Sequence, residues 1–209
     1  MKDINLDKIK ELGYEYEILE ENVLLVKNFL TEEECEYFTN YARSRSKEEW
    51  EHKYMEGIRS FVKRTYNLDS IEESNVPVTE DWYDKVIELD REAVQDLLPR
   101  AMAFFDESAK LKGSSFSILQ RQYTGSELRG HYDKFVDTTV EYAAVVYPND
   151  DYTEGEFYFR EKGLSLRPPK GSILIFPSSE EYWHGVKAVG DGPDRYAMPA
   201  FIHNESWNH

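Results

Sequence analysis

The stretch YAAVVYPNDDYTEGEFYFREKGLSLRPPKGSILIFP, residues 142–177, decides the fold. It consists of short runs rich in aromatic and β-branched residues, and turn-forming Pro, Asn, Asp and Gly separate them at 148–150 and 168–171. Each run has the length of a short strand, and the turns reverse the chain between runs. Several short strands at this spacing predict a β-sandwich or jelly roll.

The same pattern of short apolar runs separated by turns covers the second half of the chain, from Gly113 onward. A further turn, at 190–193, precedes the last run of apolar residues. The six strands predicted in this half cover residues 115–123, 142–147, 156–160, 164–167, 172–176 and 195–203.

The first half of the chain favours helices. Thr31 and Glu34 have the spacing of a capping box, in which each side chain satisfies a free backbone amide at a helix start. Pro99 suits the first turn of another helix. Apolar residues at helical spacing mark the remaining helices. The predicted helices cover residues 6–12, 31–43, 79–97 and 99–111, with one short strand at 23–26.

Helices followed by a β-rich half indicate an α+β fold, with N-terminal helices that buttress a jelly-roll core. We expect a single domain over 1–209: an extension at 1–21, a helical support region at 22–112 and the jelly-roll core at 113–209. Within the support region, residues 44–78 have a loop-like composition but include several aromatics, which predicts a lid or a packed excursion.

The charge of the chain limits its partners. The 209 residues carry 25 Lys and Arg against 41 Asp and Glu, a net charge of −16, which repels nucleic acid and anionic membrane surfaces. A single cysteine, Cys35, forms no internal disulfide and no zinc–thiolate site alone. The first residues lack the apolar segment of a secretory signal. We therefore expect a cytoplasmic protein without nucleic-acid or membrane partners.

Three side chains suggest a metal centre. His131 and Asp133 are two residues apart, so in an extended segment they project from the same face and can hold one ion. His184 is the best-placed third ligand. Two imidazoles and one carboxylate form the facial triad of non-haem Fe(II) oxygenases, which leaves open positions for a bidentate 2-oxo acid and dioxygen. Arg195, eleven residues after His184, suits the far carboxylate of such an acid.

Ordinary structural roles compete with each of these assignments. His131 and Asp133 also fit a hydrogen-bonded surface pair, and His184 fits a half-buried ring packed on Trp183. Arg195 also fits an ordinary surface salt bridge. The order of the motifs along the chain favours the metal site.

That order resembles the 2-oxoglutarate/Fe(II)-dependent dioxygenases, and within them the prolyl 4-hydroxylase-like branch. LLVKNFLTEEEC at 24–35 is similar to the branch's opening strand, turn and capped helix. LQRQYTGSELRGHYDKF at 119–135 resembles the segment with the His-x-Asp pair. The remaining matches are the run at 142–159, PPKGSILIFP at 168–177 and HGVKAVGDGPDRYAMPAFI at 184–202.

The resemblance implies a double-stranded β-helix (jelly-roll, cupin-like) core and a site within it. His131, Asp133 and His184 would bind Fe(II), Arg195 would bind the distal carboxylate of 2-oxoglutarate, and Tyr123 would hydrogen-bond the same cosubstrate. The implied cofactors are Fe(II), 2-oxoglutarate and O2, with ascorbate (L-ascorbic acid) sustaining activity. The presence of Asp133 argues against a halogenase, which needs that position vacant for halide.

The implied reaction is hydroxylation of a C–H bond, and by resemblance the substrate is a prolyl residue in a protein or peptide. Loops at 44–57 and 134–141 would frame the iron face. Two alternatives stay open: a hydroxylase of a small free substrate such as an amino acid or metabolite, and a non-catalytic jelly-roll binding module.

Overall fold

The computed structural model describes residues 2–44, 52–55, 58–64, 96–114 and 118–206. Most of the predicted helix at 79–97 and much of the predicted loop at 44–57 lie outside these residues. None of the described helices is both long and apolar enough to cross a membrane.

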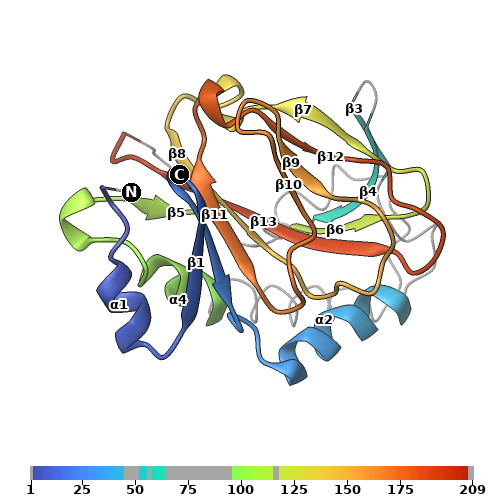
Figure 1. Ribbon diagram of the computed structural model, residues 1–209, viewed down its shortest axis with the longest axis horizontal. Coiled ribbons are helices and arrows are strands. Elements are labelled where there is room, and N and C mark those ends of the chain that lie inside the picture. Colours follow the sequence, from blue (N-terminus) through green and yellow to red (C-terminus); the bar gives the residue numbers. More distant parts are fainter. Residues whose placement is uncertain (1, 45–51, 56–57, 65–95, 115–117, 207–209) are drawn as a thin grey trace, which may run out of the picture.

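Two antiparallel sheets form the body of the molecule (Figure 1). In the described residues the larger sheet runs β1-β2-β11-β8-β13-β6-β4-β3, with β5 beside β13, and the smaller runs β10-β9-β12-β7. This arrangement confirms the predicted jelly roll. The bounds are β1 Glu15–Glu20, β2 Val23–Lys27, β3 His52–Met55, β4 Ile58–Arg64, β5 Lys112–Gly113, β6 Ile118–Gln122, β7 Leu128–His131, β8 Val140–Val146, β9 Phe157–Phe159, β10 Leu164–Leu166, β11 Ile173–Pro177, β12 His184–Val186 and β13 Arg195–His203.

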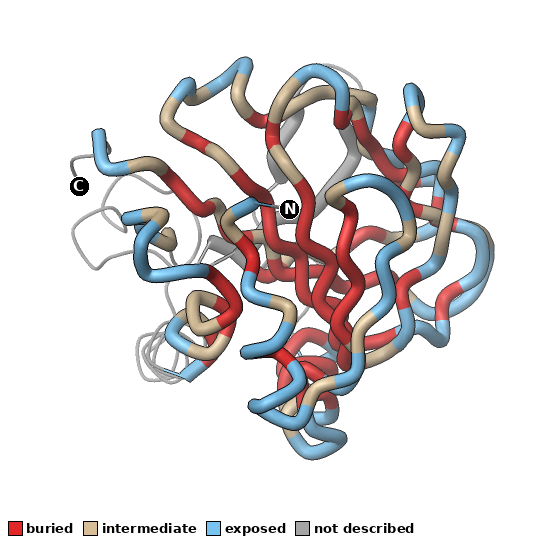
Figure 2. Tube along the Cα trace, turned by 60° about the vertical axis from the view of Figure 1, so that its left-hand side comes forward, coloured by how far each residue is buried: buried red, intermediate tan, exposed pale blue. Residues whose placement is uncertain are grey.

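The central strands are buried on both faces, as the red tube in the middle of Figure 2 shows. Along β8, β11 and β13, alternate side chains enter two different cores. One core holds Phe29, Phe38 and Phe104 and lies between the larger sheet and the helices. The other holds Phe157 and Phe176 and lies between the two sheets. The space between the sheets is therefore where a site can be built.

The helices cover one face of the larger sheet, since their buried residues belong to the first core. The capping box forms as predicted: the Thr31 amide donates to Glu34 Oε2 at 2.7 Å, and the Glu34 amide donates to Thr31 Oγ1 at 3.2 Å. Arg100 adds an ion pair to Glu34 at 2.6 Å, which ties two helices together. The helices are α1 Leu6–Glu11, α2 Glu32–Ser44 and α4 Leu98–Met102.

The helix predicted from Pro99 to residue 111 is wrong in length, because α4 ends at Met102. Beyond it the backbone pairs with the N-terminal segment instead: the Asn5 amide donates to the Phe104 carbonyl at 2.9 Å, and the Asp106 amide to Asp3 at 2.8 Å. These tertiary hydrogen bonds outweigh helix propensity, and only the short 3-10 helix η4 (Glu107–Ala109) follows.

Two further segments differ from the expected layout. The segment expected to be an N-terminal extension contributes β1, which forms an edge of the larger sheet by pairing with β2. Within the stretch expected to be a lid or excursion, β3 and β4 pair with each other, and β4 continues the sheet next to β6. Both segments thus contribute strands that the sequence pattern did not predict.

Candidate active site

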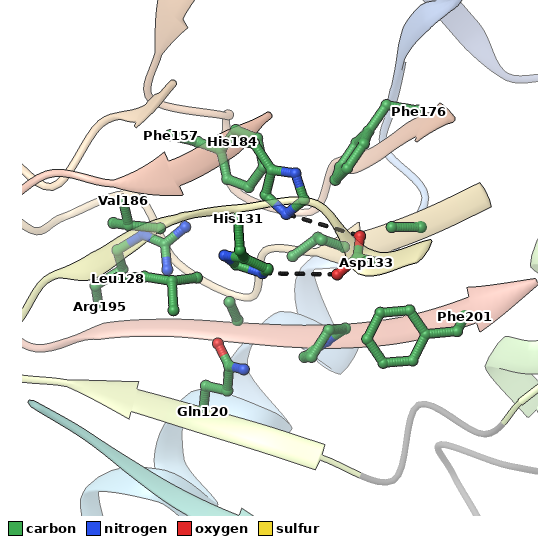
Figure 3. Close-up of a pocket in the computed structure, with 14 residues that line it drawn as sticks. Gln120, Leu128, His131, Asp133, Phe157, Phe176, His184, Val186, Arg195 and Phe201 are labelled. Carbon is green, nitrogen blue, oxygen red and sulfur yellow. Dashed lines mark ion pairs between the residues drawn. The ribbon is translucent and has the colours of Figure 1, made fainter. Parts of the chain in front are cut away.

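The three predicted metal ligands come together between the sheets (Figure 3). His131 ends β7 and His184 begins β12, and the two residues are direct partners in the antiparallel pairing of these strands. Asp133 begins the 3-10 helix η5 (Asp133–Phe135), directly beyond β7. Nitrogen and oxygen atoms of the three side chains all lie within 4.8 Å of one another.

Backbone carbonyls orient both imidazole rings. Nδ1 of His131 lies 3.0 Å from the Arg129 carbonyl, and Nδ1 of His184 lies 2.9 Å from the Tyr182 carbonyl. A carbonyl only accepts, so each Nδ1 carries the proton and donates it. In the neutral ring the lone pair is then on Nε2, and both Nε2 atoms face Asp133, at 3.6 and 3.7 Å from its oxygens. This is the tautomer that a metal ligand requires.

The surroundings of the two rings differ. Burial lowers the pKa of His184 to about 4, so this ring is neutral near pH 7. For His131, burial acts to lower the pKa, but the Asp133 carboxylate and the Arg129 carbonyl outweigh it and raise the pKa on balance. His184 is further enclosed by Phe157, stacked at 5.2 Å and 14°, and by Phe176 at 4.7 Å.

One oxygen of the buried carboxylate in this group is left without a hydrogen bond. Asp133 is 8% exposed, and its Oδ2 has no hydrogen-bond partner among the described residues. A buried, unpartnered carboxylate oxygen is costly unless a cation completes it. The donor set of two imidazoles and one carboxylate, with that oxygen turned toward them, therefore fits a divalent transition metal.

A cavity of about 120 Å³ extends from this group into the barrel (Figure 3). Arg195 lines it along with the metal-ligand set, and Gln120 adds an amide. Most of its remaining wall is apolar, so little water competes for a bound ligand's polar groups. That wall is formed by Leu128, Ala143, Val145, Phe157, Phe176, Val186, Ala197, Pro199 and Phe201.

Arg195 is 1% exposed, yet none of its contacts with the described residues is to a carboxylate. Its Nη1 donates to Gln122 Oε1, and the rings of Tyr147 and Tyr152 lie 5.3 and 5.7 Å from its guanidinium carbon. Its Nε has no hydrogen-bond partner in the described structure, and neither do the two buried tyrosine hydroxyls. A buried cation surrounded by unused donors fits a ligand carboxylate.

Tyr123 lies elsewhere, so the prediction that it binds the cosubstrate finds no support in this geometry. It packs against the core under the helices and does not line the cavity. The reason is strand alternation: Gln120 and Gln122 face the space between the sheets, so position 123 points the other way with Leu119.

Sequence reasoning missed Gln122, Tyr147 and Tyr152. The alternation of side chains along a strand could have identified one of them, Tyr147. Ala143 and Val145 line the cavity, and Tyr147 continues the same face just beyond β8. The position of Tyr152 depends on the loop after β8, and no local pattern in the sequence encodes it.

Residues 118–203 match the family described as the 2OG-Fe(II) oxygenase superfamily. The matched segment covers 86 of the 209 residues and contains His131, Asp133, His184 and Arg195. Prolyl 3-hydroxylase 2 of Homo sapiens is 42% identical to it over 57 residues, which cover 25% of this chain and 8% of that protein. The chain thus aligns with only a small part of this curated relative.

Solved structures show the same fold. A Pseudomonas putida prolyl-4-hydroxylase matches with a TM-score of 0.58 at 16% identity, over 88% of this chain and 93% of its own. The viral collagen prolyl hydroxylase of Paramecium bursaria Chlorella virus-1 matches with a TM-score of 0.55 at 16% identity, over 88% and 96%. A Trichoplax adhaerens prolyl hydroxylase, solved with a hypoxia-inducible-factor peptide fragment, matches with a TM-score of 0.58 at 14% identity, over 88% and 84%.

The chain accordingly has the double-stranded β-helix fold of these solved prolyl hydroxylases. The family match and the His-Asp-His donor set together fit Fe(II), with 2-oxoglutarate and O2 as its co-reactants.

Proposed function

We propose that this protein is a 2OG-Fe(II) oxygenase that hydroxylates a prolyl residue in a protein or peptide. The cavity carries the proposal, because it joins a His-Asp-His group to a buried arginine without a carboxylate partner. The choice of proline is supported by the 57-residue match to prolyl 3-hydroxylase 2 and by the solved prolyl hydroxylases of the same fold.

In this proposal His131, Asp133 and His184 hold the iron, with both imidazoles presenting Nε2 and the carboxylate supplying the negative charge. Fe(II) with 2-oxoglutarate supplies the activation of O2, so that succinate and CO2 form and one oxygen atom enters a substrate C–H bond. The residues of the chain supply position, charge and the exclusion of water.

Arg195 forms the ion pair with the distal carboxylate of 2-oxoglutarate, because its guanidinium lines the cavity. The hydroxyls of Tyr147 and Tyr152 are the nearby unused donors. The apolar wall keeps water from the reacting end, and Phe157 and Phe176 fix the His184 ring.

The test is incubation of the full chain with Fe(II), 2-oxoglutarate, ascorbate and a set of proline-containing peptides, followed by mass spectrometry. We expect a mass gain of one oxygen atom on proline, with succinate formed in step, and amino-acid analysis then identifies the hydroxylated carbon. His131→Ala should abolish both products. Oxidation of a free amino acid or metabolite while every peptide stays unmodified would overturn the prolyl assignment.

A further inference from the structure

The residue that faces Arg195 across the larger sheet is neutral. Gln122 ends β6 and Arg195 begins β13, and the two residues are direct partners in the antiparallel pairing of these strands. Gln122 is buried to the same degree as Arg195, and its Oε1 accepts the hydrogen bond from Arg195 Nη1. The acceptor is therefore an amide oxygen, which fixes one nitrogen of the guanidinium and adds no negative charge.

The acidic residue nearest to Arg195 in the sequence is paired with a different cation. Asp194 directly precedes Arg195, but its Oδ2 lies 2.6 Å from Arg121 Nη2 and accepts from Arg121 Nε at 2.7 Å. Neighbouring residues of an extended chain point to opposite faces, so the pair Arg121–Asp194 and the pair Gln122–Arg195 lie on different sides of the sheet. Positive charge is thus compensated on one side and left uncompensated on the side of the cavity.

The hydroxyl of Tyr147, which lies beside Arg195, does not supply the missing negative charge. Burial raises the pKa of Tyr147 and the Arg195 cation only partly offsets this effect, so the phenol stays protonated near pH 7. The chain has 41 Asp and Glu residues and a net charge of −16, yet within its described part the buried Arg195 meets no carboxylate. A cation buried in this way is stabilised fully only when an anionic group binds it.

We propose that Gln122 is a positioning residue that makes the cavity selective for 2-oxo acids with a second carboxylate, because it orients the Arg195 guanidinium and leaves its charge free for the ligand. This rests on the proposed use of 2-oxoglutarate and adds the residue on which the selectivity depends. A glutamate at position 122 would accept the same hydrogen bond but would complete an ion pair inside the protein. The ligand's distal carboxylate would then meet a neutralised cation and a like charge.

Two substitutions separate the charge of the side chain from its hydrogen bond. Gln122→Glu keeps the length and the acceptor and adds a negative charge, whereas Gln122→Met keeps the length and removes the acceptor. If Gln122 were only a structural acceptor, the Glu variant would bind 2-oxoglutarate like wild type and the Met variant would bind it less tightly. We expect the opposite order: a loss of about a hundredfold or more for Gln122→Glu and of less than about tenfold for Gln122→Met.

Calorimetry with the full chain, loaded with Mn(II) so that no turnover occurs, measures these affinities for 2-oxoglutarate and for 2-oxobutyrate, which lacks the second carboxylate. The affinity of Gln122→Glu for 2-oxobutyrate should stay within about threefold of wild type, so that the preference for the dicarboxylate is lost. Thr124→Glu is the matched control. It adds the same charge at an exposed position two residues beyond Gln122, and it should bind both acids like wild type.

Two further measurements show whether the Gln122→Glu protein is intact. Its metal-free form should unfold at a temperature no lower than wild type, because the new carboxylate completes a buried cation. Its affinity for Mn(II) should stay within about threefold of wild type, because the His-Asp-His group is unchanged. If Gln122→Glu does not fold, Gln122→Met decides: a loss of 2-oxoglutarate affinity as large as that of Arg195→Met would overturn the proposal.

The remaining outcomes distinguish this inference from the proposed function. Wild-type affinity for 2-oxoglutarate in Gln122→Glu, or an equal loss for both acids, would overturn the role of Gln122 and leave prolyl hydroxylation intact. A preference for the dicarboxylate that is lost in Gln122→Glu would uphold this role even if every prolyl peptide stayed unmodified. A wild-type protein that binds both acids equally would overturn the inference together with the cosubstrate assignment on which it rests.

Discussion

His131 and His184 face each other as direct partners in the antiparallel pairing of β7 and β12, with ring centroids 4.5 Å apart. This register brings two imidazoles, 53 positions apart in the sequence, to the same point of the smaller sheet. A one-residue slip would turn one of them to the outer face. Strand pairing, more than loop conformation, therefore fixes the distance between the two nitrogen ligands.

Removal of the carboxylate should separate metal binding from folding. Asp133→Ala deletes a buried oxygen that has no hydrogen-bond partner in the described residues, so the metal-free variant should unfold within about 1 kcal/mol of wild type, or be more stable. Wild type should gain thermal stability with added Mn(II), and the variant should not. Glu127→Ala, which removes an exposed carboxylate just before β7, is the control and should keep the gain. A variant still stabilised by Mn(II) would remove Asp133 from the site.

Arg195 should distinguish dicarboxylates from monocarboxylates. Arg195→Met keeps the length of the side chain and removes the cation, so the affinity for 2-oxoglutarate should fall by about a hundredfold or more, as for a lost buried charge pair. Binding of a 2-oxo monocarboxylic acid, weak already, should barely change. Calorimetry with the Mn(II) protein measures both ligands. An equal loss for the two acids would mean that Arg195 supports the cavity without meeting the distal carboxylate.

Substitutions of Tyr147 and Tyr123 should affect the KM for 2-oxoglutarate differently. Tyr147→Phe removes a buried hydroxyl beside Arg195 and should raise the KM for 2-oxoglutarate by about tenfold, the value of one hydrogen bond to a charged group. Tyr123→Phe alters a side chain on the other face of the sheet and should leave this KM unchanged within about twofold. Initial rates at saturating peptide provide the comparison, and the reverse ranking would restore Tyr123 to the cosubstrate site.

The capping box of Thr31 and Glu34 should make the stability of the fold depend on pH in the acid range. Burial acts to raise the pKa of Glu34, but hydrogen bonds and charge from Arg100 and the Thr31 amide outweigh it, so the pKa is lowered from its ordinary 4.5. A carboxylate with a lowered pKa stabilises the fold above the unfolded-state value and loses that contribution as pH falls through the folded-state value. Glu34→Gln should therefore lower the unfolding midpoint most above about pH 5, and the gap should close below it. A gap that is constant from pH 7 to 3 would contradict this.

Much of the fold follows from local pattern. The turns at 148–150 and 168–171, together with the capping box at Thr31, mark elements that short-range chemistry specifies, and these elements form. The failure at Pro99 has a different cause, since the N-terminal segment around Asn5 competes for the backbone at Phe104. No local propensity contains that contact.

The candidate site also combines features that the local sequence specifies with features that depend on tertiary contacts. The same-face spacing of His131 and Asp133 is a local property, and their order before His184 and Arg195 follows the family resemblance. The position of Tyr123 depends on which face each residue of β6 presents, and an error of one residue reverses that assignment. The environment of Arg195 depends on tertiary contacts, because these contacts come from β6, from the residue just beyond β8 and from the loop that follows it.

One titration tests the central claim most directly. Under anaerobic conditions the metal-free protein is titrated with Fe(II) and then with 2-oxoglutarate, while the visible metal-to-ligand charge-transfer band is recorded. We predict a band for wild type, its loss in His131→Ala, and a much weaker response to 2-oxoglutarate in Arg195→Met. A folded wild-type protein that gives no band, or a band that persists in His131→Ala, would contradict the assignment of this cavity as the iron and 2-oxoglutarate site.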